Sequence, residues 1–399
     1  MLLSRVVQAK YRDWKADYRS RDQLPSRLSW VSFFEGVKGS KRIKGRGSRE
    51  LGSAGPTSRI GMGAAEHLCF WWGSECCYRH GHSAGSLSIH GHLLVGKNFF
   101  RRAILASGIW DVFGPKPFEH PDVQAEYDRL VNYLKVENVE ELRSVPSDKL
   151  AAAYQALHPG FPLAQIIDDS NIKGGFFTLG ANETHDYIYN PNYANIPVIV
   201  GDVETEGIIF GALFQDRPAE PLLTNLQKRL PTSYLKEYSL DSESAPPSST
   251  SIHQILPGLI KLSSDLPFSA PIARFCANYP GPVCSYHFDR PTQVDGLMKD
   301  IANHGVDMSY AFGGHLPHFK DEIDKEVSRK WMGFIISFVN GEEPWPARGK
   351  QGNSMVVTKD GKIGMQNEVG TRRWAAYEKQ EECWNGVQEV WHDLINSRL

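Results

Sequence analysis

The chain has 399 residues, of which 41% are hydrophobic and 23% charged, and its formal net charge is -2. A chain of this length can bury a large core, as one big α/β domain or as two smaller ones. The near-neutral balance gives no overall field that would attract nucleic acid or an anionic membrane. The first residues lack the apolar core of a signal peptide, and no later run is long enough to span a bilayer. We therefore expect a cytoplasmic protein with neither nucleic acid nor a membrane as partner.

Residues 1–80 differ from the rest of the chain, because they are charged, rich in Arg, Gly and Ser, and without a sustained apolar period. The basic run between Lys38 and Arg49 would, in isolation, indicate RNA binding. A solvated, disordered segment is the commoner explanation of such a run. We expect residues 1–80 to be disordered or poorly folded, and residues 81–399 to form the folded domain.

Six cysteines do not make a disulfide framework in a chain of this length. Cys76 and Cys77 are adjacent, but no second pair with ligand spacing completes a metal site. Cys276 and Cys284 could form a bridge, although small buried thiols are the default expectation. We expect no metal and no cofactor.

The pattern G-x-S-x-G occurs at residues 81–85, with Ser83 at its centre. A serine on a sharp strand-to-helix turn needs small neighbours, so that its hydroxyl stands clear of the sheet and the next N–H points at a developing oxyanion. The residues after Gly85 are typical of a helix. Those before Gly81 are not typical of a buried parallel strand, because Arg79 and His80 are unfavourable in such a site. We therefore expect the apolar strand that should carry Ser83 to be missing.

From Gly81 onward, short apolar runs alternate with helical stretches, which is the order expected of a mostly parallel sheet with crossover helices. The expected strands are residues 103–106, 196–200 and 282–288. The expected helices are residues 122–135, 147–157 and 378–397, and residues 240–251 are expected to form a flexible surface loop.

Partners for a catalytic serine are expected on loops just past the carboxyl ends of such strands. The serine needs a base to take its proton and a carboxylate to orient that base. Residues 201–207 offer three carboxylates, Asp202, Glu204 and Glu206, and the segment after strand 282–288 leads to His304. The chain order serine, acid, histidine is the one that this class of α/β fold uses.

Five stretches together resemble the type-B carboxylesterases and cholinesterases. They are residues 81–85, 98–108, 201–210, 264–268 and 304–313. The resemblance covers residues 81–350 and implies an α/β-hydrolase, with a mostly parallel central sheet flanked by helices.

The resemblance also implies roles for individual residues. Ser83 would be the nucleophile, His304 the general base, and Glu206 its orienting carboxylate, because the acid of the family directly precedes a glycine. The N–H of Ala84 would be one oxyanion donor. The implied activity is hydrolysis of a small-molecule carboxylic ester through an acyl-enzyme, without a cofactor.

The chain departs from this family upstream of the serine. The family places a His-Gly-Gly loop there, which donates the other oxyanion N–H groups, together with the first strands of the sheet. Residues 1–80 contain no such loop. Losing one donor of this kind costs about 10²–10³-fold in turnover. We therefore expect the first strands to be missing and this chain to be a weak or inactive esterase.

A change of reading frame would explain the departure. Trp71-Trp72-Gly73 must be encoded by TGG TGG GGN, and reading one base later forces two consecutive glycines. Codons allowed for residues 50–62 also permit a family-like sequence in the shifted frame. The sequence thus favours an out-of-frame translation of residues 7–80, with the true frame resuming at Gly81.

Other functions stay open. Members of this fold also serve as non-catalytic binding proteins, although these usually lack the serine. Nucleic-acid binding through the basic run would require an affinity that depends on salt. A metal site at His82, His90 and His92 lacks a carboxylate or cysteine to complete it. The sequence does not indicate the oligomeric state.

Overall fold

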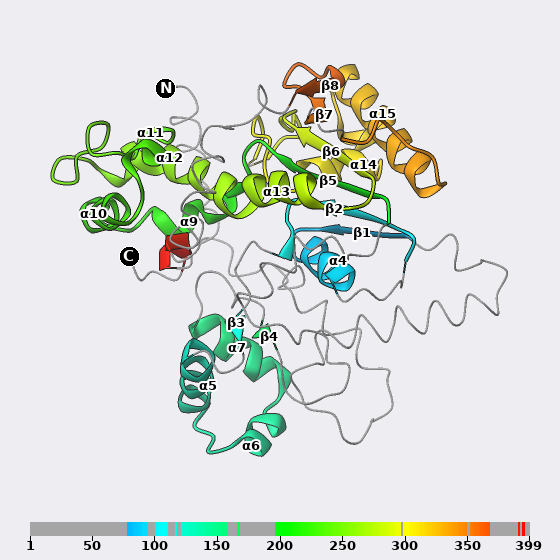
Figure 1. Ribbon diagram of the computed structural model, residues 1–399. Helices are drawn as coiled ribbons and strands as arrows, with labels where there is room; N and C mark the ends of the chain where they lie inside the picture. The colour runs from blue at the N-terminus through cyan, green and yellow to red at the C-terminus, as the bar shows by residue number, and fades with distance from the viewer. Residues whose placement is uncertain are drawn as a thin grey trace.

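The computed structural model describes residues 78–94, 100–110, 116–117, 121–157, 166–167, 196–348, 352–367 and 390–395, apart from residues 297 and 392. Its central feature is a six-stranded sheet with the order β1-β2-β5-β6-β7-β8 (Figure 1). The strands are β1 (Tyr78–His82), β2 (Arg102–Ala106), β5 (Val198–Val203), β6 (Val283–Phe288), β7 (Asn353–Val357) and β8 (Ile363–Asn367). The strands from β1 to β7 are parallel, and β8 runs antiparallel to β7. The expected mostly parallel α/β sheet is confirmed.

The middle strands are β5 and β6, and every residue in them is buried. This agrees with the continuous apolar runs of the sequence, because a parallel strand covered on both faces has no solvent side. The strands expected at residues 103–106, 196–200 and 282–288 are confirmed to within three residues at each end.

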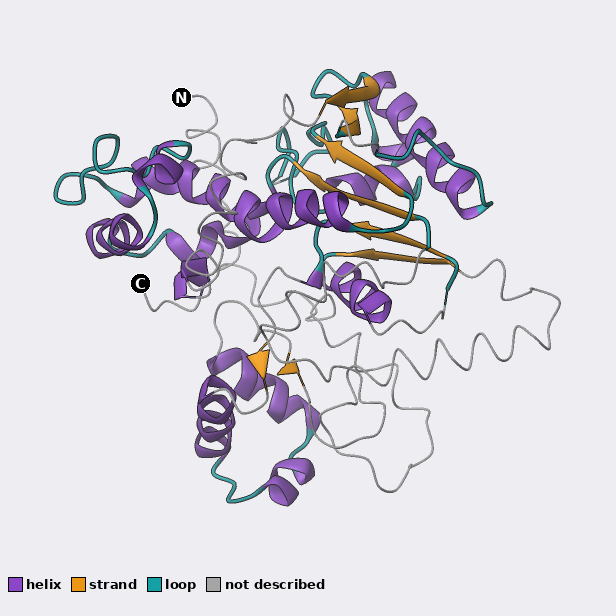
Figure 2. Ribbon diagram, in the orientation of Figure 1, coloured by secondary structure: helices purple, strands orange, loops and turns teal. Residues whose placement is uncertain are grey.

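Helices cover both faces of the sheet (Figure 2). One face packs against α4 (Ala84–Leu94) and α13 (Ala270–Asn278), and the other against α14 (Val306–Ala311) and α15 (Glu322–Val339). Successive strand residues alternate between these layers: Leu105 and Val200 belong to the core with α4 and α13, and Ile104 and Ile199 to the core with Trp331 of α15.

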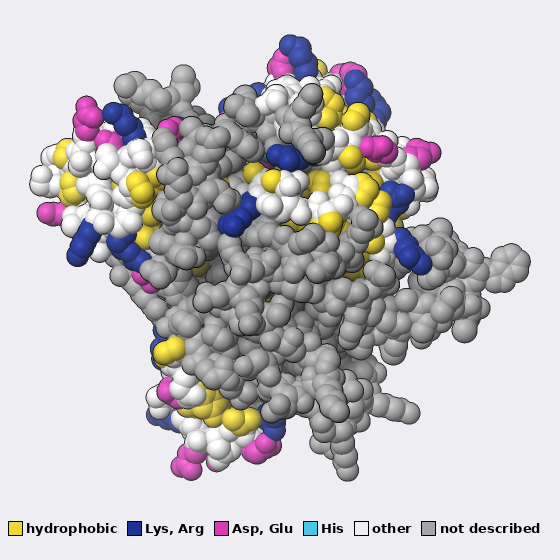
Figure 3. All heavy atoms as spheres, viewed as in Figure 1, with side chains coloured by type: hydrophobic (Ala, Val, Ile, Leu, Met, Phe, Trp, Pro, Cys, Tyr) yellow, Lys and Arg dark blue, Asp and Glu magenta, His cyan; other side chains and the backbone are white. Residues whose placement is uncertain are grey.

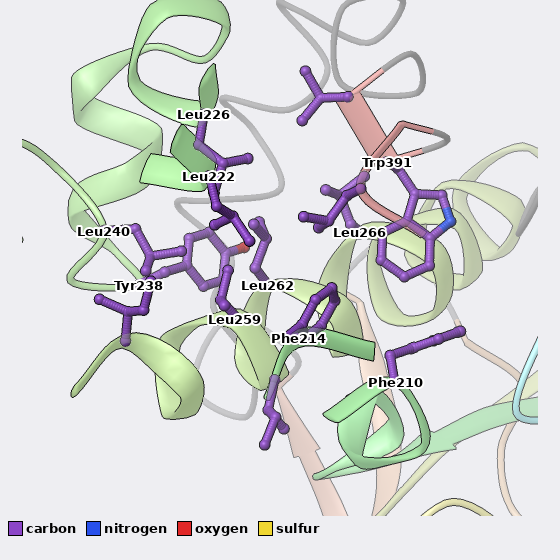
Figure 4. Close-up of a cluster of buried hydrophobic side chains, with 14 of the residues drawn as sticks. Phe210, Phe214, Leu222, Leu226, Tyr238, Leu240, Leu259, Leu262, Leu266 and Trp391 are labelled. Carbon is purple, nitrogen blue, oxygen red and sulfur yellow. The ribbon is translucent and has the colours of Figure 1, made fainter. Parts of the chain in front are cut away.

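A third core lies among helices beyond the sheet (Figure 4). These helices are α9 (Gly211–Phe214), α10 (Ala219–Arg229), α11 (Thr232–Lys236) and α12 (Ile252–Ser264). Trp391 packs into this core, with its ring edge-on to Phe210 at 4.8 Å between centroids. The helix expected at residues 378–397 lies mostly outside the described residues, but its Trp391 is buried, as an apolar helix face requires.

Helix α12 continues through a π turn, Asp265–Ser269, directly into α13. The N-terminus of α12 is closed by a capping box between Ser251 and Gln254. The π turn contains Pro267, whose missing N–H would interrupt an ordinary helical ladder. Phe268 lies in the same turn and is buried.

A separate group of helices lies away from the main sheet (Figure 1). It consists of α5 (Pro121–Leu134), α6 (Val139–Ser144) and α7 (Ser147–Leu157), with the short paired strands β3 (Lys116–Pro117) and β4 (Ile166–Ile167) nearby. The helices expected at residues 122–135 and 147–157 are confirmed.

The apolar strand that should carry Ser83 was expected to be missing, and this expectation is wrong in one respect, because a strand is present there although it is not apolar. Residues 78–82 form β1, which pairs in parallel with β2 from Tyr78 to His82. In the described sheet β1 is an edge strand, and its polar side chains are exposed or half-buried except at Gly81. Ladder hydrogen bonds come from the backbone, so an edge strand can form without the apolar run that a central strand needs. Residues 1–77 lie outside the described residues.

Cys276 and Cys284 are free and buried, as expected by default, and they belong to cores on opposite faces of the sheet, so the bridge left open from the sequence does not form. One smaller expectation is corrected. Residues 240–251 are not simply a surface loop, because Leu240 and Ala245 are buried in the helical core. The Gln227 side chain donates to both of their carbonyls at 2.9 Å.

The described surface carries lysine, arginine and acidic side chains interspersed over the face drawn in Figure 3. This mixing agrees with the formal net charge of -2. Among the described helices, none is both long and apolar enough to cross a bilayer.

Candidate active site

Ser83 lies at the turn between β1 and α4, with a left-handed φ of 54°. This conformation is unfavourable for a residue that has a Cβ and is held here by hydrogen bonds on both sides. The Ser83 N–H donates to the Ala106 carbonyl at 2.9 Å, and its carbonyl accepts from the Leu87 N–H at 3.0 Å. The turn is therefore tied to β2 on one side and to the first turn of α4 on the other.

The two glycines of the turn have different roles. A Cβ at Gly81 would lie 2.4 Å from the Gly85 carbonyl carbon, a backbone atom that cannot move aside cheaply. A Cβ at Gly85 would meet nothing within 4 Å. The close approach of strand and helix therefore requires glycine at position 81, and the described surroundings do not require it at position 85.

The end of β5 and the loop after it present three carboxylates, and each has a different partner. Asp202 accepts from His287 Nδ1 at 2.6 Å, across adjacent strands. Glu204 forms an ion pair with Lys359 at 2.6 Å, with its side chain 38% exposed. Glu206 is fully buried, and its Oε2 is hydrogen-bonded to His304 Nδ1.

Backbone contacts hold Glu206 in this position. It begins a 3₁₀ turn, Glu206–Phe210, and its Oε1 accepts from the Val203 N–H at 2.9 Å. Gly207 packs so closely on α12 that a Cβ there would lie 2.2 Å from the Ile260 carbonyl oxygen, and the Gly207 N–H donates to Ser264 Oγ at 2.8 Å. The glycine after the acid thus allows the carboxylate to sit inside the fold.

The segment that carries His304 is tied to the same loop. The Thr205 N–H donates to the Ala302 carbonyl at 2.9 Å, and Thr205 forms a parallel bridge with Asn303. Gly305 then turns the chain with a φ of 88° into α14. Because two backbone contacts join the loops, Glu206 and His304 meet although 98 residues separate them in the sequence.

Burial raises the pKa of the Glu206 carboxyl, and the charge of Asp202 raises it further. The imidazole of His304 and the Val203 N–H act in the opposite direction by favouring the carboxylate. Because Nδ1 of His304 is engaged with Glu206, its Nε2 is the ring nitrogen left for a second partner.

In the described part of the chain, no hydrogen bond joins the side chains of Ser83 and His304. The residue before Ser83 does contact this histidine: the His82 ring lies 4.5 Å from the His304 ring between centroids. Phe268, from the π turn, places a second ring 5.3 Å from His304.

Ala84 is the first residue of α4, directly after Ser83. The first N–H groups of an α-helix have no acceptor within the helix and carry the positive end of its dipole. The Ala84 N–H therefore lies at the positive end of this helix, next to Ser83.

The histidines considered for a metal have separate surroundings. His90 is buried, and its Nδ1 accepts from the Trp110 N–H at 2.9 Å. Burial lowers the pKa of His90 to about 3, and burial with nearby Arg79 lowers that of His92 to about 4. Within the described residues, no group of three or more His, Cys, Asp or Glu side chains is arranged to hold a metal.

Three contacts at the site were not assigned roles from the sequence. They are the rings of His82 and Phe268 on His304, and a short hydrogen bond of 2.6 Å from the Tyr286 hydroxyl to Asp307, just beyond His304. The position of His82 directly before Ser83 was the available signal for the first. Residue spacing holds no signal for the other two, because they depend on how α13 and α14 pack against the sheet.

Comparison with known families agrees with this geometry. The model of the carboxylesterase family matches residues 80–388, which is most of the chain. The chain belongs to the carboxylesterase family. The match begins within β1 and includes the turn at Ser83 and both loops that carry Glu206 and His304.

Two curated relatives of this carboxylesterase-family chain are fungal proteins named as lipases. Secreted lipase 1 of Botryotinia fuckeliana (strain B05.10) is 27% identical over 297 residues, which cover 66% of this chain and 49% of the relative. Lipase 4 of Diutina rugosa is 24% identical over 344 residues, which cover 75% of this chain and 58% of the relative. The chain thus spans about half the length of the curated relatives it matches.

Solved esterase structures share the fold. A PNB esterase aligns with a TM-score of 0.62 and 20% identity, covering 88% of this chain and 69% of the esterase. The Geobacillus stearothermophilus carboxylesterase aligns with a TM-score of 0.63 and 17% identity, covering 82% of this chain and 68% of the other. The α/β-hydrolase fold expected from the sequence is confirmed.

Proposed function

We propose that this chain is a serine hydrolase of carboxylic esters, with Ser83 as nucleophile, His304 as general base and Glu206 as the carboxylate that orients His304. The contact between Glu206 and His304 is the observation that supports the proposal most strongly. Of the three carboxylates among residues 201–207, Glu206 is the one hydrogen-bonded to this imidazole, and it leaves Nε2 available to the serine.

The proposed reaction has two halves. Ser83 Oγ attacks the ester carbonyl carbon while its proton passes to His304 Nε2, and the same proton is delivered to the alcohol as its bond to the acyl group breaks. Water then attacks the acyl-serine and gives a proton to His304, which returns it to Ser83 Oγ as the carboxylic acid leaves. The buried Glu206 carboxylate stabilises the imidazolium that forms in each half.

Slow turnover is part of the proposal. The Ala84 N–H would bind the oxyanion, but residues 1–80 hold no His-Gly-Gly sequence to supply the further donors found in the family. One missing donor costs about 10²–10³-fold in turnover. We expect measurable covalent chemistry at Ser83 with weak overall hydrolysis.

The test is turnover of p-nitrophenyl acetate by the full chain, together with labelling by a fluorophosphonate, which reacts covalently with activated serines. We expect Ser83→Ala to abolish both signals and a control, Ser88→Ala on the following helix turn, to retain them. Equal turnover and equal labelling in the Ser83→Ala variant would refute the assignment.

A further inference from the structure

The strand that presents Ser83 also presents an imidazole to the proposed base. His82 is the last residue of β1, in register with Ala106 of β2, and the backbone hydrogen bonds that fix Ser83 therefore fix His82 as well. Its ring lies 4.5 Å from the His304 ring at an interplanar angle of 50°. This is the distance range of favourable aromatic contact.

The same ring also fits the turn that carries His304. A Cβ built on Gly305 would lie 3.1 Å from His82 Cε1 and 3.2 Å from His82 Nε2. Gly305 has a φ of 88°, so the chain bends sharply at the residue after His304. His82 therefore packs into the corner that sets the direction of His304.

The polar atoms of His82 do not account for this placement. Its Nε2 is buried and has no hydrogen-bond partner among the described residues. A buried ring nitrogen without a partner costs stability, so the ring is held here by packing rather than by hydrogen bonding.

The groups that face His82 keep the ring neutral. Burial is the main cause that lowers its pKa to about 4, and His304 and His80 act in the same direction, against the opposing charge of Asp307. A neutral ring can remain packed on His304 while that imidazole gains and loses its proton. A charged ring would oppose each imidazolium that forms.

We propose that His82 is a positioning residue for the ester-hydrolysis reaction, and that its tilted ring contact holds the His304 imidazole in line between Glu206 and Ser83. The catalytic part of this inference rests on the proposed function. The packing itself is a property of the folded chain and can be measured separately.

The first measurement uses proton NMR of the full chain, because a histidine N–H bonded to a carboxylate gives a far-downfield resonance. We expect this resonance in the wild type and its loss in Glu206→Gln and His304→Gln, which assigns it. His82→Ala removes the ring and should broaden or abolish the resonance, whereas His82→Phe keeps a ring and should retain it. If His82→Ala does not fold, as judged by its thermal melt, His82→Asn replaces it.

The second measurement is the kinetics of p-nitrophenyl acetate hydrolysis and of fluorophosphonate labelling. We expect His82→Ala to lower kcat and the labelling rate by about 10-fold or more with KM within about twofold, and His82→Phe to restore kcat to within about threefold of wild type. His80→Gln is the matched control: it lies on the same strand, but its ring contacts Phe312 at 5.2 Å rather than His304, so its kinetics should stay near wild type.

The outcomes separate the two proposals. An unchanged downfield resonance and unchanged kcat in His82→Ala would overturn the role of His82, whatever Ser83→Ala does. Loss of the resonance in His82→Ala, with turnover that does not depend on Ser83, would support the packing role and refute the catalytic assignment instead.

Discussion

Glu206 combines two properties that rarely coincide in one side chain. It is fully buried, which raises the pKa of its carboxyl, and it contacts an imidazole that can stabilise its charge. A folded-state pKa above that of the unfolded chain means that the folded state binds the proton more tightly. Stability from this group is therefore present at low pH and is lost as the pH rises through the raised value. The buried carboxylate therefore lowers the stability of the fold at neutral pH, and we expect its benefit to be catalytic.

This balance predicts opposite effects of one substitution on rate and stability. We expect Glu206→Gln to lower kcat for p-nitrophenyl acetate by about 10⁴-fold, as for a triad whose histidine is held in the wrong tautomer. At pH 7 its urea midpoint should match or exceed that of the wild type, because the buried charge is gone.

Glu204→Gln is the control for that experiment. It lies two residues away and changes an ion pair with Lys359 in which both side chains are more than a third exposed, so kcat should stay within about twofold. A similar loss of rate in both variants would contradict the distinct role of Glu206.

Part of the candidate site could be predicted from the sequence. Asp202, at the end of β5, and Glu206, just after it, are both carboxylates near the carboxyl end of one strand. The glycine after Glu206 was the feature that separated them, through a resemblance rather than through geometry. The structure supplies the physical reason, since Gly207 packs against the Ile260 carbonyl. The ring of Phe268 on His304 could not be predicted, because it depends on the π turn between α12 and α13.

At the scale of elements, the turn from β1 to α4 depends on the close approach of a strand and a helix. The two glycines flank the same serine and look equivalent in the sequence. In the structure only the space at Gly81 is closed, by backbone atoms of Gly85 and Ser86.

Alanine at each glycine should therefore have very different effects on folding. We expect Gly81→Ala to lower the free energy of unfolding by about 3 kcal/mol, since it forces an overpacked contact with backbone. Gly85→Ala should change it by no more than about 1 kcal/mol, because the site is open and alanine favours the helix. Urea denaturation of the two variants checks this; equal losses would show that the backbone approach does not limit position 81.

The elements also show where sequence patterns succeed. Strands β5 and β6 and helix α7 were predictable because their residues are either mostly apolar or periodic. Strand β1 was missed because an edge strand is stabilised by its ladder with β2, and its side chains, Arg79 and His80 among them, carry no strand signal. Pattern reasoning detects apolar side chains, and β1 has few of them.

For the molecule as a whole, neutral histidines concentrate at the β1 edge of the sheet, on β1 and on the helix that follows it. His80 and His82 lie on β1, and His90 and His92 on α4, and burial lowers the pKa of all four. The unfolded chain would protonate each of them near the ordinary value of about 6.5. Acid is therefore expected to destabilise the folded state through β1 and α4.

The sign of the resulting pH dependence follows from the number of bound protons. Between about pH 6.5 and pH 4, the unfolded chain binds protons at these histidines that the folded chain does not, so stability is full above this window and falls as the pH is lowered through it. Each histidine that stays neutral in the fold contributes about 1.4 kcal/mol per pH unit below its unfolded pKa. Acidification to pH 5 should thus lower the urea midpoint strongly.

His90 offers the sharpest test of this acid sensitivity, because burial holds its pKa at about 3 and it lies away from the proposed catalytic side chains. In His90→Gln the amide oxygen can still accept from the Trp110 N–H, so the variant should fold. We expect its free energy of unfolding to fall less between pH 6 and pH 5, by about 1 kcal/mol relative to wild type. His253→Gln, which removes an exposed histidine on α12 instead of a buried one, is the matched control. Identical slopes for His90→Gln and wild type would mean that His90 takes up its proton without unfolding, and that the acid sensitivity has another source.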